Sequence, residues 1–152
     1  YGALVMVFDI LKAFFAVKIA SALFPQFMAA GIITGTSAVF GHVFPFYLKF
    51  RGGKGLAAYG GMILGVDPLL FLILLVVTVS MMFIINYGVA MPLSAAVLFP
   101  VLYGLRHPDT VCIIAAIIAS ILLIIKHIPN IFRCKRGEDS KIREFVKNQF
   151  HK

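Results

Sequence analysis

Long apolar runs separated by short polar breaks dominate the chain. Runs with few or no charges cover residues 2–24, 27–47, 69–85, 89–105 and 110–126. A helix needs about 20 apolar residues to cross a bilayer, so each run is a candidate span. A further apolar run, 56–66, would reach only about 17 Å as a helix, against a hydrocarbon core of about 30 Å. The pattern predicts an all-α, polytopic integral membrane helix bundle with about six membrane-crossing segments, one of them short.

Composition and charge support this class of protein. The 152 residues are 61% hydrophobic and 13% charged, with a mean hydropathy of +1.00, which a soluble domain of this size could not bury. Seven of the fourteen Lys and Arg residues follow His127, and three lie between Lys49 and Lys54. This clustering is typical of cytoplasmic membrane loops, so the net charge of +8 does not indicate nucleic acid. Anionic lipid head groups or phosphorylated substrates are the expected partners.

The basic segments predict a topology. The loop 48–55 and the tail after residue 126 should both be cytoplasmic, so an even number of crossings must separate them. The short run 56–66 must then cross together with the three clear spans after it, unless one span is re-entrant. We expect the cytoplasmic face to carry residue 1, the loop 48–55, the break at 86–88 and residues 126–136. The turns at 67–68 and 106–109 should lie on the opposite side.

Ionisable residues within the first span must face the bundle interior. Asp9 and Lys12 are three residues apart, so they share a helix face and can pair. Charges at membrane depth are costly, which leaves two interpretations: an ion pair that fixes helix packing, or one that supports a site.

One stripe of the second span consists of small residues and a histidine. Gly31, Gly35, Ala38 and His42 recur at helical spacing. Small residues allow a second helix to approach closely, so His42 is expected to point into the bundle.

Two further segments have the chemistry of an anion site. In L-K-F-R-G-G-K-G (48–55), successive glycines can turn backbone N–H groups toward a phosphate beside Lys54; the alternative is an ordinary positive-inside loop. It is not a P-loop, because the spacing differs and no Ser or Thr follows Lys54. His127, Asn130 and Arg133 share a face if a helix continues through Pro129, and together could hold a phosphate and a hydroxyl. The alternative is that they are simple interfacial residues.

The chain divides into a bundle, 1–137, and a basic tail, 138–152. In the tail Ile142, Phe145, Val146 and Phe150 fall on one face, which predicts an amphipathic helix lying on the cytoplasmic membrane surface. Cys112 and Cys134 form no disulfide framework, and no metal-ligand spacing is present. No metal or cofactor is expected, and the pattern specifies no oligomeric state.

Three motifs together resemble one family. The first is the run G-H-V-F-P-F-Y-L-K-F-R-G-G-K-G-L-A (41–57), and the second is the D-I-L-K of residues 9–12. The third is the H-I-P-N of residues 127–130, followed by Arg133, Gly137, Glu138 and Lys141. They are similar to signatures of the acylphosphate-dependent glycerol-3-phosphate acyltransferases of bacterial membranes, the PlsY type. The resemblance extends from about Gly2 to Ile142.

The resemblance implies a reaction in phospholipid synthesis at a bacterial-type plasma membrane. An acyl phosphate would donate its fatty acyl group to the 1-hydroxyl of glycerol 3-phosphate, giving lysophosphatidic acid. The implied phosphate-binding residues are Gly52, Gly53, Lys54, Gly55, Arg51 and Arg133. His127 and Asn130 would position glycerol 3-phosphate, with His127 as a candidate proton acceptor and Lys54 as a third catalytic group. His42, Asp9 and Lys12 are expected to support the site.

The chain departs from the family pattern at several points. A G-S-G-N-P-G-A-T-N-like loop that the family carries is absent, Asn86-Tyr87-Gly88 replaces an Arg-Tyr-x-Ser-like signature, and Ala58 stands where a threonine is usual. The first residue is tyrosine, which predicts a processed or partial product. The departures keep a second hypothesis open: an incomplete or truncated homologue that binds phosphate or lipid head groups without turnover. A third is a small transporter or channel in which Asp9, Lys12 and Lys18 line a path.

Overall fold

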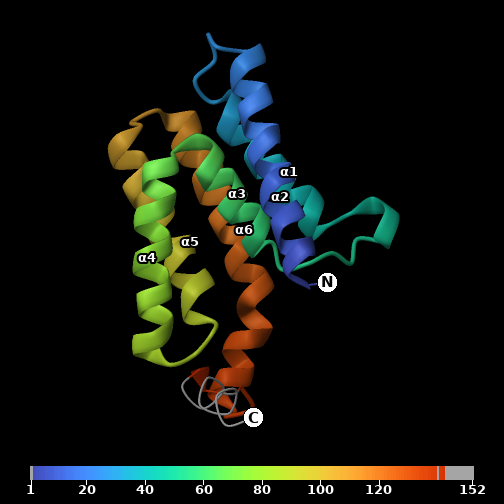
Figure 1. Ribbon diagram of the computed structural model, residues 1–152, viewed down its shortest axis with the longest axis vertical. Helices are drawn as coiled ribbons and strands as arrows, with labels where there is room; N and C mark the ends of the chain where they lie inside the picture. Colours follow the sequence, from blue (N-terminus) through green and yellow to red (C-terminus); the bar gives the residue numbers. More distant parts are fainter. Residues whose placement is uncertain (1, 140, 143–152) are drawn as a thin grey trace.

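The computed structural model describes residues 2–139 and 141–142, and helices account for nearly all of this part of the chain (Figure 1). The elements are α1 (Gly2–Leu23), α2 (Ala30–Val43), the 3₁₀ turn η1 (Phe46–Leu48), α3 (Leu56–Val66), α4 (Pro68–Ile85), α5 (Ala90–Arg106) and α6 (Thr110–Lys135). The predicted all-α bundle is confirmed, and the short run 56–66 is a helix with the predicted bounds.

The connections between α3 and α6 gather at two opposite ends of the bundle (Figure 1). At one end the Ile142 N–H donates to the Asn86 carbonyl at 3.2 Å. We call this end, which carries residues 86–89 and 127–139, the basic end. The segment 44–55 projects from the side of the bundle nearer its middle (Figure 1), and its Lys54 contacts Asn130 of α6. At the other end Arg106 Nε lies 2.7 Å from Asp67 Oδ2. Four helices, α3 to α6, therefore separate the glycine loop from the tail, and the even number of crossings between them stays a prediction.

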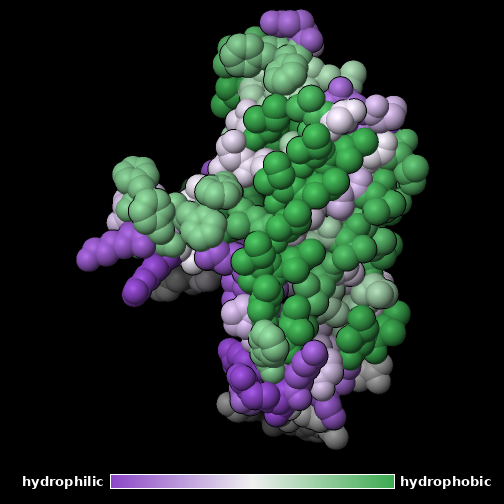
Figure 2. All heavy atoms as spheres, turned by 180° about the vertical axis from the view of Figure 1, so that it is seen from behind, coloured by the Kyte–Doolittle hydropathy of each residue, from purple (hydrophilic) through white to green (hydrophobic). Residues whose placement is uncertain are grey.

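Among the described residues, three segments are long and apolar enough to span a membrane: Ala30–Leu48, Pro68–Ile85 and Thr110–Lys135. The apolar helices α3 and α5 are shorter, at 11 and 17 residues. Helix α1 has 22 residues but includes Asp9, Lys12 and Lys18. On the face shown in Figure 2, the side chains along the middle of the bundle are largely hydrophobic. The protein is thus a membrane protein, while the figure of six crossings stays a prediction.

Two prolines lie near helix boundaries, with different outcomes. The run 27–47 is helical only from Ala30 to Val43, so its predicted extent was wrong, because Phe44 precedes Pro45 and the residue before proline is disfavoured in a helix. Helix α6 extends beyond the run 110–126 and continues through Pro129 to Lys135, which is the condition on which His127, Asn130 and Arg133 share a face. Proline removes one backbone donor, and the carbonyl that loses it belongs to Ile125, a residue 52% exposed on the bundle surface. The predicted tail helix (Phe145, Val146 and Phe150) lies outside the described residues.

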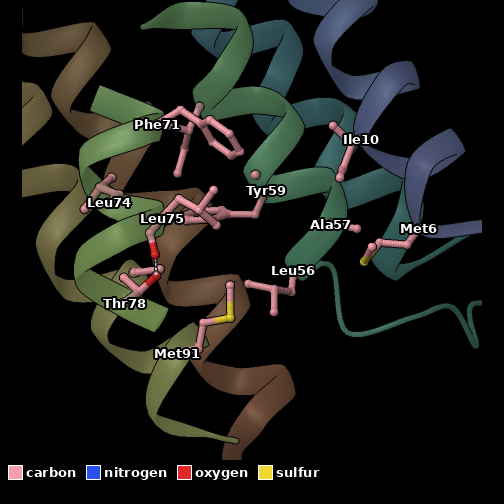
Figure 3. A pocket seen from close by; sticks show the side chains of 13 residues that line it. Met6, Ile10, Leu56, Ala57, Tyr59, Phe71, Leu74, Leu75, Thr78 and Met91 are labelled. Carbon is pink, nitrogen blue, oxygen red and sulfur yellow. Dashed lines mark hydrogen bonds between the residues drawn. The ribbon is translucent and has the colours of Figure 1, made fainter. Parts of the chain in front are cut away.

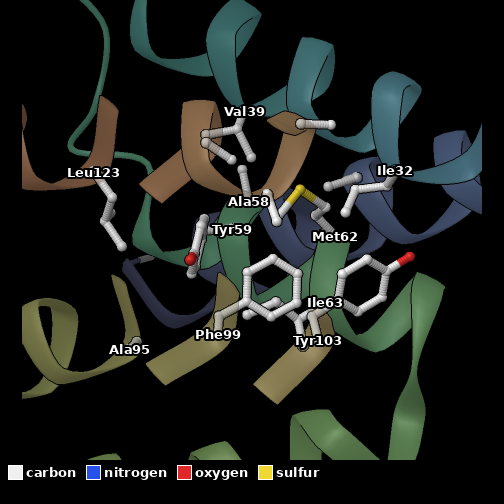
Figure 4. Close-up of a cluster of buried hydrophobic side chains, with 14 of the residues drawn as sticks. Ile32, Val39, Ala58, Tyr59, Met62, Ile63, Ala95, Phe99, Tyr103 and Leu123 are labelled. Atoms are coloured by element: carbon white, nitrogen blue, oxygen red, sulfur yellow. The ribbon is translucent and has the colours of Figure 1, made fainter. Parts of the chain in front are cut away.

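The core lies between α2, α3, α5 and α6 and centres on Tyr59, Met62 and Phe99 (Figure 4). The Tyr59 hydroxyl lies 2.7 Å from Ser120 Oγ. Ser120 donates its own proton to the Ala116 carbonyl at 2.8 Å, so Tyr59 is the donor to Ser120. Lipid tails are as apolar as this core, so close van der Waals packing and such hydrogen bonds hold the helices together.

The predicted small-residue stripe of α2 packs as expected. A Cβ on Gly35 would lie 2.8 Å from Val17 of α1 and also overlap Met62 of α3. A Cβ on Gly31 would overlap Ser21 and approach Val17 to 3.2 Å. The two glycines therefore allow α1 and α3 to approach α2 closely.

A buried carboxylate, Asp67, holds the end opposite the basic end. Its Oδ1 caps α4 by accepting the Leu70 N–H at 2.9 Å, and its Oδ2 accepts from Arg106 Nε. Burial alone would raise the pKa of Asp67, but the hydrogen bonds from Leu70 and Arg106 outweigh it, and the pKa lies below its usual value. Asp67 therefore ties the α3–α4 turn to the end of α5 as a carboxylate.

Candidate functional site

The glycine loop folds back on the end of α2. The Gly52 N–H donates to the Val43 carbonyl at 3.2 Å, and the Phe50 N–H donates to the Pro45 carbonyl at 3.0 Å. This differs from the expectation that Gly52 contributes a backbone donor to a phosphate, because its N–H is already used within the loop. Gly52 has a packing role instead, since a Cβ there would overlap the His42 carbonyl oxygen and lie 2.8 Å from that of Val43.

Gly53 lies directly against the ring of His42. A Cβ on Gly53 would overlap His42 Nε2 and lie 3.1 Å from Cε1. Gly55 follows with φ of +86° and forms the N-cap of α3. L-residues with a side chain seldom adopt this conformation, so glycine is needed for the chain to turn into α3.

On its other edge His42 meets the ion pair of α1. The Lys12 ammonium donates to Asp9 Oδ1 at 2.6 Å and contacts His42 Nδ1 at 2.9 Å, while Asp9 Oδ1 lies 3.2 Å from the same nitrogen. The predicted pairing of Asp9 with Lys12 is confirmed. His42 therefore connects the ion pair of α1 with the backbone of the glycine loop at Gly53.

Within the part of the chain that the structure describes, one side-chain hydrogen bond joins the loop to α6. Lys54 Nζ donates to Asn130 Oδ1 at 3.0 Å, which joins residues 76 positions apart. Because α6 continues through Pro129, Asn130 and His127 lie on one side of it, as the spacing predicts. Lys54, Asn130 and His127 thus form one cluster.

The hydrogen bond of His127 determines which ring nitrogen carries the proton. Nδ1 lies 2.8 Å from the Leu123 carbonyl oxygen, which can only accept, so Nδ1 is the protonated nitrogen. The neutral ring then has its acceptor at Nε2. The residue is only 3% exposed, so this tautomer and orientation are held by packing as well.

The two arginines expected at the site are exposed. Arg51 lies on the loop and Arg133 one turn beyond Asn130 on α6. Within the described residues, neither side chain makes a hydrogen bond or ion pair. The structure therefore assembles the lysine, asparagine and histidine, but brings neither arginine into contact with them.

An apolar cavity of about 540 Å³ begins one residue after the glycine loop (Figure 3). It lies between α1, α3, α4 and α5, and its lining includes Ile10, Leu56, Tyr59, Thr78 and Met91. Sequence reasoning assigned none of these residues to a cavity, although Ile10 and Leu56 lie within two of the family motifs. Their only signal was the small side chains of the run 56–66, among them Ala57 and Gly60, which leave room beside α3.

Two departures from the family pattern have structural roles here. Ala58 is fully buried among the core side chains. Asn86 is the C-cap of α4 with φ of 65°, a left-handed conformation that asparagine tolerates better than most residues. Its carbonyl accepts the Ile142 N–H, so this position closes a helix and holds the start of the tail.

A membrane helix bundle with a lysine–asparagine–histidine cluster beside an apolar cavity belongs to the class of proteins that handle amphiphilic, anionic molecules. Within that class the comparisons identify the family. The family model for glycerol-3-phosphate acyltransferase matches residues 1–137, and the chain belongs to this family.

Sequence relatives agree with this assignment. The chain is 38% identical over 149 residues to the glycerol-3-phosphate acyltransferases of Staphylococcus aureus strains JH9 and Newman, a match that covers 93% of this chain and 73% of each relative.

Solved structures agree as well. The glycerol 3-phosphate form of PlsY (YgiH), an integral membrane glycerol 3-phosphate acyltransferase, matches with a TM-score of 0.86 and 27% identity, over 93% of this chain and 71% of that protein. Its lysophosphatidic acid form matches with a TM-score of 0.85 and 28% identity, over 93% and 72%.

Proposed function

We propose that this chain transfers a fatty acyl group from acyl phosphate to the 1-hydroxyl of glycerol 3-phosphate, giving lysophosphatidic acid and phosphate. The observation that carries the proposal is the Lys54–Asn130 contact beside His127, next to the apolar cavity. The proposal is supported by the solved structures of this fold, whose two forms are a glycerol 3-phosphate form and a lysophosphatidic acid form. These molecules are a substrate and a product of this reaction.

The start of α3 supplies donors for a phosphate. This helix has no side-chain cap, so its first N–H groups are open to an anion. Within the described residues, the N–H groups of Gly53, Lys54 and Gly55 have no backbone acceptor. These groups, with the Lys54 ammonium, would hold one phosphate, and Arg51 and Arg133 would swing in from the exposed surface to hold phosphate oxygens.

The cavity suits the acyl chain of the donor. Its volume lies within the range of about 300–1,000 Å³ that is usual for ligand pockets. Because Leu56 lines it and follows Gly55 directly, a chain bound there would place its acyl phosphate at the glycine loop. The hydroxyl of Thr78 already donates to the Leu75 carbonyl at 3.5 Å, so it places no competing donor in the cavity.

Acyl transfer needs no covalent enzyme intermediate, because phosphate is a good leaving group. The glycerol 3-phosphate hydroxyl oxygen attacks the acyl carbon and forms the new ester bond, while the bond from that carbon to the phosphate oxygen breaks. His127 Nε2 takes the hydroxyl proton. The hydrogen bond from Nδ1 to the Leu123 carbonyl leaves Nε2 unprotonated and therefore able to accept it. Asn130 positions the acceptor, and His42 with Asp9 and Lys12 holds the loop in place. We further propose that the basic end faces the cytoplasm, since basic loops favour that side.

The test is acyl transfer to labelled glycerol 3-phosphate by the purified chain in detergent. Lys54→Ala should lower kcat/KM by at least about 100-fold, the usual scale for a preorganised charged donor. Lys135→Ala removes an exposed cation in the last turn of α6, outside the cluster, and is the matched control that should retain activity. No product from well-folded protein would reject the proposal for this chain.

A binding measurement, added to the acyl-transfer assay, distinguishes a second candidate function. Asn86 and Ala58 replace expected polar residues, which favours a homologue that binds phosphate without turnover. Calorimetric binding of glycerol 3-phosphate, abolished by Lys54→Ala but without acyl transfer, would establish that alternative.

A further inference from the structure

Residues 45–51 project sideways from the bundle, and we call this segment the finger (Figures 1 and 2). Its apolar side chains lie largely outside the protein: Phe46 is 80% exposed, Tyr47 72%, Leu48 52% and Phe50 64%. Lys49 and Arg51 alternate with them. Exposed aromatic and basic residues in one short segment are unusual for a surface that meets only water.

The backbone of the finger is ordered by its own hydrogen bonds. The Leu48 N–H donates to Pro45 and the Arg51 N–H to Leu48, both at 3.1 Å. Lys49 and Phe50 have φ of 52° and 60°, in the left-handed region that residues other than glycine rarely occupy. The rings of Phe46 and Tyr47 pack edge to face with centroids 5.5 Å apart. The segment is therefore a built turn that presents these side chains.

Contacts with α6 indicate the depth of the finger along the membrane normal. Just before it, the Phe44 ring lies 4.3 Å from Lys126 Nζ, and just after it Lys54 contacts Asn130. Four residues of helix correspond to about 6 Å, so the finger leaves and rejoins the bundle within one narrow layer. The uncharged part of α6 ends at Lys126, which is where a hydrocarbon core gives way to head groups.

We propose that the finger is a lateral anchor in the head-group layer, and that its partner is anionic phospholipid of the surrounding bilayer. Aromatic rings favour this layer because one end can be apolar and the other wet. Lys49 would pair with lipid phosphate, to which basic residues are attracted near an anionic surface. Because Gly52 and Gly53 follow the finger and pack on His42, an anchored finger also restrains the glycine loop. This inference does not require turnover.

Fluorescence can test the depth of the finger, since the chain contains no tryptophan. Phe46→Trp is placed in the full chain, reconstituted in vesicles of phosphatidylcholine with or without phosphatidylglycerol. We expect quenching by lipids brominated near the head group to exceed quenching by lipids brominated near the chain end by about twofold, since aromatic residues prefer the interface. The matched control is Val76→Trp, at a 66%-exposed position in the middle of α4, which should show the reverse order. Tyr47→Trp serves if Phe46→Trp does not fold.

Charge dependence tests the identity of the lipid. Phosphatidylglycerol should reduce quenching of the finger tryptophan by aqueous acrylamide, a neutral quencher that an anionic surface does not repel, and Lys49→Gln should weaken the finger's preference for the anionic surface by about fivefold. Acrylamide quenching like that of a fully water-exposed tryptophan in both vesicles would overturn the proposal. So would a blue-shifted emission that neither acrylamide nor brominated lipid quenches, because a protein partner would then cover the finger. Unchanged behaviour in Lys49→Gln would contradict the role of the lipid charge.

Discussion

The contact between Gly53 and His42 makes a prediction that tests how the site is held. Gly53→Ala adds one methyl group, and that Cβ would overlap Nε2 of the imidazole. The ring cannot turn aside freely, because Lys12 and Asp9 lie 2.9 and 3.2 Å from its other nitrogen. The loop must therefore move, and Lys54 moves with it.

The size of the effect follows from the required displacement. Carbon and nitrogen atoms of this kind rest at about 3.5–4.0 Å, so the loop must shift by roughly 1 Å. A misplacement of about 1 Å in a group that positions substrate can cost about 100-fold in rate. That corresponds to about 2.7 kcal/mol of transition-state stabilisation. We therefore expect Gly53→Ala to lower kcat/KM for glycerol 3-phosphate about 100-fold.

The assay is acyl transfer to labelled glycerol 3-phosphate, with thermal unfolding in detergent measured in parallel. Gly41→Ala is the matched control, because a Cβ at Gly41 meets nothing within 4 Å. It should leave both activity and the unfolding temperature close to those of the parent chain. A loss of activity in Gly53→Ala without loss of folded protein is the expected pattern.

A double-mutant cycle separates this steric mechanism from others. His42→Ala removes the ring that the new Cβ would meet, so adding Gly53→Ala to it should cost no more than about twofold. The reasoning is refuted if Gly53→Ala lowers activity by the same factor in both backgrounds. It is equally refuted if the single variant is fully active.

Three further predictions concern other parts of the molecule. Asn130→Ala leaves the Lys54 ammonium without its amide partner and should raise the KM for glycerol 3-phosphate about tenfold, by steady-state kinetics, while Asn130→Asp should fail to restore it because a carboxylate repels phosphate. Ala57→Phe fills the cavity beside the glycine loop and should shift the preferred donor to shorter acyl phosphates, measured by competition between two chain lengths. Asp67 has a lowered pKa in the folded chain, so the stability that its carboxylate contributes is complete above its unfolded pKa and is lost as pH falls below about 4. Asp67→Asn should therefore remove that part of the acid dependence of the unfolding temperature. Arg106 is kept in both proteins.

Much of the fold could be predicted because charge and hydropathy mark the ends of membrane helices. The run 56–66 is the clearest example, since a parity argument from two basic segments required this short run, and α3 has the same bounds. The error fell at Pro45, and the continuation through Pro129 was left open, because a local rule for proline did not decide either outcome. Pro45 ends α2 early, whereas α6 passes through Pro129 at the edge of the bundle, and only the tertiary setting distinguishes the two.

The site could be predicted as a set of residues, but its contacts could not. Helical spacing placed His127 and Asn130 on one face and paired Asp9 with Lys12. It could not show that Lys12 reaches His42, because periodicity identifies faces and says little about which faces meet. The cavity was missed for the same reason, since its lining comes from four helices whose residues carry no shared motif.

The glycine loop also shows that one residue type can serve different purposes within four positions. Gly52 donates its N–H to Val43, Gly53 accommodates His42, and Gly55 turns the chain into α3. Within the described residues, the backbone donors of this loop that have no backbone acceptor are those at residues 53–55, next to the uncapped start of α3, and we propose these for the anion. Gly52 and Gly53 pack against the end of α2, and Gly55 provides the turn into α3. The rigidity of the phosphate site therefore originates in α2 and in the ion pair of α1. Substitutions in α1, which lies outside the Lys54–Asn130–His127 cluster, should therefore act on catalysis through the placement of Lys54.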